Sequence, residues 1–106
     1  MARNYFDLPD KLSRYETAKV AILPVPFERT TSYVKGTVRG PQAILTASHQ
    51  VELYDEELGS ETCDAGIASL APVKIESGPV EKVLEKINLG VARIVRDGKL
   101  PVMLGG

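Results

Sequence analysis

The sequence contains no tryptophan, one cysteine and one histidine among its 106 residues. The lone cysteine, Cys63, can form neither an internal disulfide nor a zinc site built from thiolates. We expect it to be a buried free thiol in a reducing compartment. The one histidine, His49, falls beside the apolar face of an expected helix, where a partly buried or surface histidine is the ordinary case. These absences favour neither a disulfide-stabilised domain nor a zinc-bound one.

Long apolar runs and an excess of charge are also missing. No stretch approaches the roughly 20 apolar residues that span a membrane, and charges interrupt the apolar positions at the N-terminus, unlike in a secretory signal. The net charge is −1, which provides no basic surface for nucleic acid or for an anionic membrane. We therefore expect a cytoplasmic protein with neither a nucleic-acid partner nor a membrane partner.

The composition that remains is typical of a folded domain. Hydrophobic residues make up 43% of the chain and charged residues 25%, which argues against disorder, and the length allows one domain of modest size. Residues 1–18 show no clean period. We expect an N-terminal arm there that docks its aromatic side chains, with a simple surface tail as the alternative, and we expect residues 19–106 to form the domain.

The first part of that domain predicts a strand, a polar loop and a helix. The apolar run at 19–23 is too short for a helix and fits a strand buried on both faces. Because Pro24 and Pro26 lack backbone donors, the strand should stop near Leu23 or leave the ladder there. After the loop, Gly40 and Pro41 predict the start of a helix over 41–52, with the glycine as N-cap. In open α/β sheets, ligands bind where such loops leave the carboxyl ends of the strands.

The second half predicts a further strand–helix–strand unit. A strand is expected within 63–71. Aliphatic residues recur at three- and four-residue steps over 80–94 and predict the clearest amphipathic helix, with Gly98 as its left-handed cap. The segment 100–104 is expected to be a second central strand, because such a unit can form a right-handed parallel crossover. The acidic segment 53–58 is expected to be an edge strand or an extended connector.

The loop after the first strand is the candidate functional segment. It is about 17 residues long, and loops of that length in a compact domain are usually functional or disordered. Its residues Glu28, Thr31, Ser32 and Tyr33 are our candidates for contact with a substrate, for a lid, or for contact with another subunit. The alternative is that the hydroxyl groups bind the backbone of the loop itself.

Several short motifs in and around this loop keep a regular spacing. They are Pro26-Phe27-Glu28, Thr31-Ser32-Tyr33, Gly36, Gly40-Pro41, Ala43-Ile44 and Ala47-Ser48. Their order and spacing resemble the first β-loop-α segment of the ureohydrolases, the arginase and agmatinase family, on its agmatinase branch. Glu28 stands where that branch usually has aspartate, and Val38 and Leu45 stand where arginine is common.

Two later segments extend the resemblance. Residues 102–106, which read Val-Met-Leu-Gly-Gly, resemble the strand that leads directly into the first metal ligand of that family. Asp64 and Gly66 resemble a further family segment, in which Ile67 replaces a second aspartate. The resemblance covers most of residues 19–106, which corresponds to about the first third of such a protein.

The resemblance implies a three-layer αβα fold with a mainly parallel sheet, of which this chain holds only the first strands and helices. It also implies an agmatinase-like hydrolase that uses two Mn²⁺ ions to cleave a guanidino compound, with agmatine favoured, to urea and an amine. The enzyme would be a homo-oligomer, either a trimer or a hexamer. Arginase, guanidinobutyrase and formiminoglutamase activities stay open within the family.

The position of the family's metal ligands sets a further expectation. The first of them should follow Gly106, so we expect no catalytic residue, no metal ligand and no hydrolase activity within residues 1–106 alone. The alternative outside the enzyme class is a small non-catalytic α/β module, or a truncated homologue, that binds a partner protein.

Overall fold

A three-stranded parallel sheet forms the centre of the computed structural model, which describes residues 4–29 and 36–106. Its strands are β1 (Val20–Val25), β4 (Ile67–Ser69) and β5 (Leu100–Gly105), in the order β4-β1-β5. Both neighbours pair with β1 in parallel. Parallel strands require crossover connections, and helices provide the two crossovers here.

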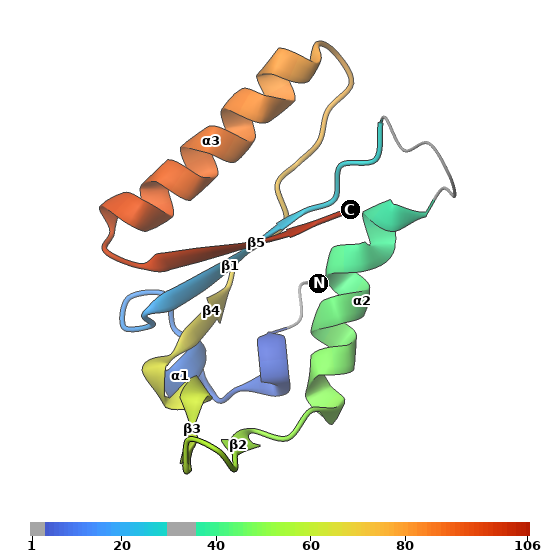
Figure 1. The fold of residues 1–106 in the computed structure, drawn as a ribbon. Coiled ribbons are helices and arrows are strands. Elements are labelled where there is room, and N and C mark those ends of the chain that lie inside the picture. The colour runs from blue at the N-terminus through green and yellow to red at the C-terminus, as the bar shows by residue number, and fades with distance from the viewer. Residues whose placement is uncertain (1–3, 30–35) are drawn as a thin grey trace.

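Helices cover both faces of this sheet, which confirms the predicted three-layer α/β architecture (Figure 1). The alternation of side chains along β1 explains the arrangement, because successive residues of a strand point to opposite faces. Leu23 belongs to the buried cluster under α3 (Val80–Arg96), whereas Ile22 shares an apolar surface with Ile44 of α2 (Gly40–Ala47).

Strand β1 continues past Pro24, so the prediction that this proline ends the strand was wrong. Val25 still pairs with Gly105 of β5. The carbonyl of Pro24 accepts a hydrogen bond from the N–H of Val73 at 2.9 Å, so the polar groups of this residue face the β4 side. Because β4 has already ended at Ser69, the missing N–H of Pro24 falls outside the ladder and removes no sheet bond.

Helix α2 is shorter than the predicted helix over 41–52, because its last turn tightens into a 3₁₀ turn at Ser48–Gln50. The buried hydroxyl of Ser48 donates to the carbonyl of Leu45 at 2.6 Å. A serine hydroxyl that binds the backbone in this way competes with the regular helical bond.

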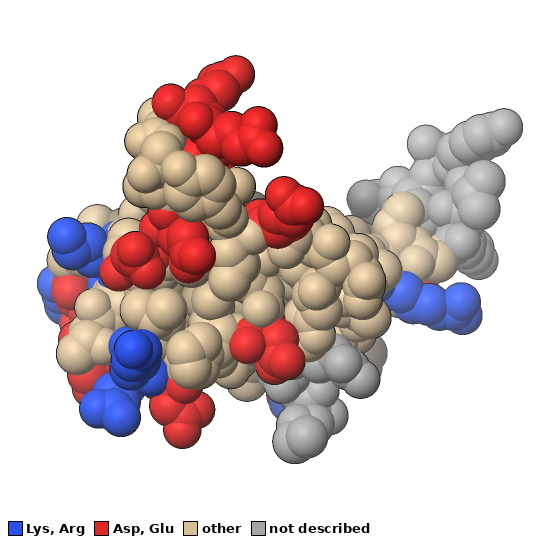
Figure 2. Space-filling model, turned by 90° about the horizontal axis from the view of Figure 1, so that it is seen from below, with Lys and Arg blue, Asp and Glu red and all other residues tan. Residues whose placement is uncertain are grey.

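The acidic segment 53–58 forms part of an antiparallel hairpin and is not an edge strand of the main sheet. In this hairpin β2 (Tyr54–Asp55) pairs with β3 (Ser60–Glu61). The carboxylate of Asp55 fixes the turn, since it accepts hydrogen bonds from the N–H groups of Glu57 at 2.9 Å and Leu58 at 3.1 Å. Figure 2 views the molecule from this end and shows carboxylates projecting from it.

The strand predicted within 63–71 is also shorter, because its first residues form a 3₁₀ turn at Thr62–Ala65 and β4 begins only at Ile67. Gly66 separates the two elements and has a φ of +85°. Cys63 is confirmed as a buried free thiol with 1% of its surface exposed. Burial raises the pKa of this thiol, so it stays protonated at neutral pH.

The predicted amphipathic helix and its cap are confirmed. Helix α3 buries Val83 and Ile94 against the sheet, and Gly98 follows it with a φ of +76°. Strand β5 lies at an edge of the described sheet and not at its centre, so Leu100 and Met103 are 62% and 53% exposed. No helix in the described part of the chain is both long enough and apolar enough to cross a membrane.

Backbone hydrogen bonds attach the N-terminal residues to the domain. The N–H of Tyr5 donates to Oγ of Ser69 at 2.9 Å, and the N–H of Phe6 donates to Oγ of Ser48 at 2.8 Å. Leu8 follows and is buried, and the short helix α1 (Asp10–Ser13) comes after it. The segment is therefore held by two serine hydroxyls from different elements as well as by apolar burial.

Candidate functional site

The carboxyl ends of β1 and β5 meet the N-terminal end of α2 at one edge of the sheet, and Figure 1 shows the end of β5 beside the first turn of this helix. A Cβ atom on Gly106 would overlap the carbonyl oxygen of Thr37 and would lie 3.0 Å from Cδ of Pro41. A Cβ on Gly40 would lie 3.5 Å from the carbonyl oxygen of Gly105. The two backbones therefore approach each other at a distance that leaves no room for a side chain at position 106.

Glu28 lies at this edge, just after β1, and its carboxylate binds the residues that lead into α2. Its Oε1 atom accepts hydrogen bonds from the N–H of Gly36 and from the hydroxyl of Thr37, the latter at 3.1 Å. The bond from Gly36, followed by the hydroxyl bond from Thr37, lowers the pKa of Glu28 below its usual range. The charged carboxylate thus serves as an acceptor for its own loop.

The start of α2 explains why an acceptor is needed there. The 3₁₀ turn Thr37–Arg39 runs directly into the helix, so Arg39 occupies the N-cap position that we predicted for Gly40, and Pro41 stands within the first turn. Arg39 makes no side-chain cap bond. A helix start carries unpaired N–H groups and a partial positive charge, and a nearby carboxylate satisfies both.

Arg29 is a residue of this edge that the sequence analysis missed. Its guanidinium donates to the carbonyl of Gly78 at 2.7 Å and to the carbonyl of Glu76 at 3.1 Å, and it lies 5.3 Å from the ring centroid of Phe27. The two acceptors are backbone atoms nearly fifty positions away along the chain. No pattern of side chains in the sequence could have predicted these contacts, because every residue type carries a backbone carbonyl group.

The remaining predicted site residues, Thr31, Ser32 and Tyr33, lie outside the described residues. Their expected contact with a substrate or with another subunit stays a prediction. The same expectation for Glu28 also stays a prediction, although the structure places this residue at the edge where a ligand of an α/β sheet would lie.

The described residues of this edge do not fit the two Mn²⁺ ions that the resemblance implies. Such a centre needs several carboxylates and imidazoles around a shared space. Among residues 4–29 and 36–106, this edge offers the carboxylate of Glu28, which is already engaged by two donors. The imidazole of His49 lies at the other end of α2, where its Nε2 atom is 2.9 Å from the carbonyl oxygen of Asn4.

One other group of metal-type ligands occurs in the part of the chain that the structure describes. Side-chain atoms of Glu61, Cys63 and Asp64 lie within 4.8 Å of one another beside the β2–β3 hairpin. The thiol of Cys63 is a poor ligand here, because burial and the neighbouring carboxylates raise its pKa and metals bind the thiolate. The two carboxylates are exposed, so a solvated acidic surface accounts for this group.

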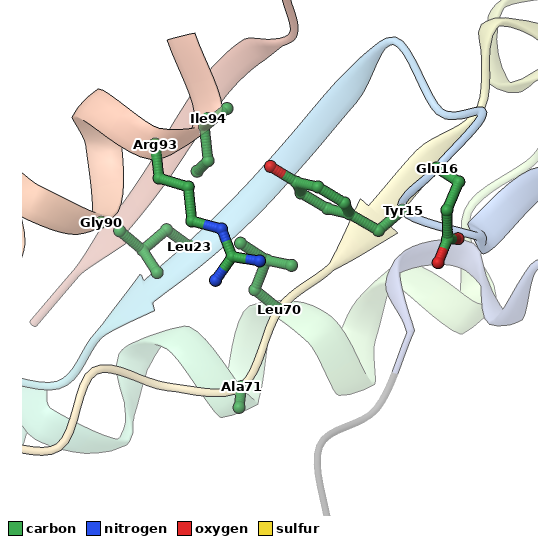
Figure 3. Close-up of a pocket in the computed structure, with 8 residues that line it drawn as sticks. All are labelled: Tyr15, Glu16, Leu23, Leu70, Ala71, Gly90, Arg93 and Ile94. Carbon is green, nitrogen blue, oxygen red and sulfur yellow. The ribbon is translucent and has the colours of Figure 1, made fainter. Parts of the chain in front are cut away.

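A cavity of about 500 Å³ lies between α3 and the sheet (Figure 3). Leu23, Leu70 and Ile94 line it, and Arg93 extends over it toward the ring of Tyr15. The hydroxyl of Tyr15 donates to Oδ2 of Asp97 at 2.7 Å, and this bond raises the pKa of Tyr15. Glu28, the predicted site residue that the structure describes, does not line this cavity.

Comparison with known proteins identifies the family to which this chain belongs. The family model of the arginase family matches residues 18–106, which is most of the chain. The chain belongs to the arginase family. This membership confirms the resemblance drawn from the loop motifs and from the Val-Met-Leu-Gly-Gly segment.

Two curated relatives show how far the similarity to this arginase-family chain extends. It is 41% identical over 102 residues to the N(1)-aminopropylagmatine ureohydrolase of Synechocystis sp. and 39% identical over 97 residues to an enzyme of the same name from Thermus thermophilus. Each match covers 92% of this chain and 33% of the relative. The chain therefore spans about a third of the length of these relatives.

A solved structure confirms the arginase-like fold. The agmatine ureohydrolase of Thermoplasma volcanium superposes with a TM-score of 0.80 at 35% sequence identity, over 92% of this chain and 33% of that one. The parallel sheet with helices on both faces is thus the architecture of part of a ureohydrolase.

Proposed function

We propose that this chain is part of a ureohydrolase that cleaves the guanidino group of agmatine or of an agmatine derivative to urea and an amine. The observation that carries the proposal is the 41% identity over 102 residues to an N(1)-aminopropylagmatine ureohydrolase. The agmatinase of Halalkalibacterium halodurans, at 28% identity over 94 residues, supports the same class of substrate. Both names refer to agmatine or its derivative, which lack the carboxylate of arginine, and this is why we favour this class over arginine.

We further propose that two Mn²⁺ ions serve the full-length protein and that residues outside positions 1–106 hold them. The described carboxyl edge supports this division, because the carboxylate of Glu28 is committed to a backbone donor and a hydroxyl donor. The catalytic residues would likewise lie outside positions 1–106. Residues 1–106 alone should release no urea.

The setting of the enzyme is proposed on the same basis. We place it in the cytoplasm as a homo-oligomer, a trimer or a hexamer, with a small guanidino compound as its partner and with no nucleic-acid or membrane partner. The net charge of −1 and the absence of a long apolar run in the sequence support this setting.

Product release from the full-length protein tests the proposed function. Agmatine, N(1)-aminopropylagmatine, arginine, guanidinobutyrate and formiminoglutamate would each be incubated with the purified protein, with added Mn²⁺ and after treatment with a chelator. We expect agmatine or its aminopropyl derivative to give the highest kcat/KM, and we expect the chelator to abolish turnover. If the full-length protein hydrolyses none of these compounds, the proposed enzyme class is refuted. Urea release by residues 1–106 alone would refute the proposal that the metal ligands lie outside these residues.

A further inference from the structure

We propose that Glu28 is a positioning residue, which holds the first turn before α2 in place and thereby fixes where the end of β5 enters the active site. The inference rests on the proposed function and deepens it, because it assigns a role in the reaction to a residue that touches neither substrate nor metal. Three contacts on the described residues carry it.

The first contact is the pair of hydrogen bonds to a single oxygen atom. Gly36 and Thr37 both donate to Oε1 of Glu28, and these two donors stand at the start of the helical segment that continues into α2. Charge-assisted bonds of this kind are shorter and stronger than bonds between neutral groups. Glu28 therefore anchors the 3₁₀ turn that precedes α2, through the N–H of Gly36 just before this turn and the hydroxyl of its first residue, Thr37.

The second contact transmits the position of this turn to the sheet. The carbonyl of Thr37 packs directly on Gly106, and the space between them would not admit even a Cβ atom. A shift of Thr37 toward the strand must therefore displace Gly106, and a shift away from it opens a gap beside the strand end. The two backbones touch directly, so a displacement of one is passed to the other without an intervening side chain.

The third contact prevents Glu28 from following such a shift. The neighbouring residue, Arg29, donates to the carbonyls of Glu76 and Gly78, which lie in the connection that leads into α3. Two adjacent residues of opposite charge thus bind different segments. Glu28 accepts hydrogen bonds from the turn before α2, and Arg29 donates to backbone carbonyls before α3. The pair forms a brace across the end of β1, between the segments that precede α2 and α3.

Variants of Glu28 in the full-length protein test this role. Glu28→Ala removes the acceptor, whereas Glu28→Gln keeps the shape and one carbonyl oxygen but loses the charge. We expect Glu28→Ala to lower kcat on the preferred guanidino compound by about tenfold, because misplacement of a reacting group by less than 1 Å has effects of this order. KM should change by less than about twofold, since uniform substrate binding is untouched. The kcat of Glu28→Gln should fall between that of Glu28→Ala and that of the unchanged protein.

Glu85→Gln is the matched control, because Glu85 is an exposed acidic residue of α3 and supplies none of the donors or acceptors of the brace. It should leave kcat and KM unchanged. Equal kinetics for Glu28→Ala and Glu85→Gln would overturn the proposal. A rise in KM at constant kcat would also overturn it, because that result indicates direct contact of Glu28 with the substrate.

Hydrogen exchange supplies a measurement that does not depend on activity. The amides of Gly36 and Thr37 should exchange faster in Glu28→Ala and in Glu28→Gln than in the unchanged protein, and the Glu85→Gln control should show no change. Unchanged exchange at these amides would refute the brace even if activity falls. If the unchanged protein hydrolyses no guanidino compound, the proposed function fails, and the exchange data still decide whether the brace exists. Glu28→Gln, which preserves side-chain volume, keeps the test decisive if Glu28→Ala does not fold.

Discussion

Replacement of Gly66 by alanine should destabilise the fold strongly, and the structure separates two reasons. The backbone of Gly66 has φ +85° and ψ 129°, outside the basins that residues with a Cβ atom occupy. A Cβ at this position would also lie 2.9 Å from Cα of Ala18 and 3.3 Å from its Cβ. The first reason is local, and the second is a tertiary contact between the start of β4 and the residues before β1.

The magnitude follows from these two terms. Backbone conformations of this kind cost about 1–3 kcal/mol for a residue other than glycine, and forcing apart a packed backbone contact costs about 1–3 kcal/mol more. Restriction of the unfolded chain by alanine returns about 0.4–1 kcal/mol. We therefore expect the free energy of unfolding to fall by about 2–5 kcal/mol, with most weight toward the upper half, because the nearest obstacle is a backbone atom that cannot rotate away.

Gly98 provides the matched comparison. It has a similar φ of +76°, but a Cβ there would meet no atom within 4 Å. Gly98→Ala should therefore lower the free energy of unfolding by only about 1–2 kcal/mol for the left-handed backbone. The restriction of the unfolded chain by alanine again offsets part of this loss. The difference between the two variants isolates the tertiary contact.

Urea unfolding of the two full-length variants, followed by far-ultraviolet circular dichroism, measures this difference at an unchanged denaturant slope. The double variant Ala18→Gly/Gly66→Ala adds a control. It should recover little stability, because the closest approach is to Cα of Ala18 and not to its side chain. A free energy of unfolding for Gly66→Ala within about 0.5 kcal/mol of that for Gly98→Ala would refute the argument from the contact.

Two further predictions concern α2 and its start. Leu45 is 1% exposed, so Leu45→Ala should lower the free energy of unfolding by about 2–5 kcal/mol through lost burial and a residual cavity, whereas the exposed Gln42→Ala on the same helix should change it by less than about 0.5 kcal/mol. The hydrogen bond from Gly36 lowers the pKa of Glu28 in the folded state, so the carboxylate stabilises the fold at neutral pH, and this contribution disappears as the pH falls through the lowered pKa. The stability difference between the unchanged protein and Glu28→Gln, measured by urea unfolding from about pH 7 to about pH 3, should therefore shrink on acidification, and a difference that grows would contradict the assigned contact.

Local sequence patterns were sufficient to predict helix α3 and the residue that ends it. The aliphatic repeat over 80–94 predicted α3, and Gly98 predicted its end, because helical periodicity and a left-handed cap are properties of neighbouring residues. The resemblance carried by the loop motifs predicted the family and the layered fold. It worked because glycine and proline at fixed spacings reflect backbone requirements, such as the close approach at Gly106.

Prediction failed where the deciding partner was distant along the chain. Pro24 should have ended β1, yet the strand continues because the neighbouring strand β4 stops first. The helix over 41–52 was expected to be regular, yet the hydroxyl of Ser48 binds both its own helix and the N–H of Phe6. The early end of β4 and the contact of Ser48 with Phe6 both involve residues far away along the chain.

The sequence by itself determined the class of this protein: an α/β chain of the arginase family, with a polar loop after its first strand and two glycines at the end of its last. Only the tertiary structure decided that Glu28 binds the start of α2 and that Arg29 binds the turn before α3. The physical reason is that backbone N–H and carbonyl groups are the partners in both contacts. Every residue except proline carries both of these groups, so the folded chain alone selects which of them a charged side chain reaches.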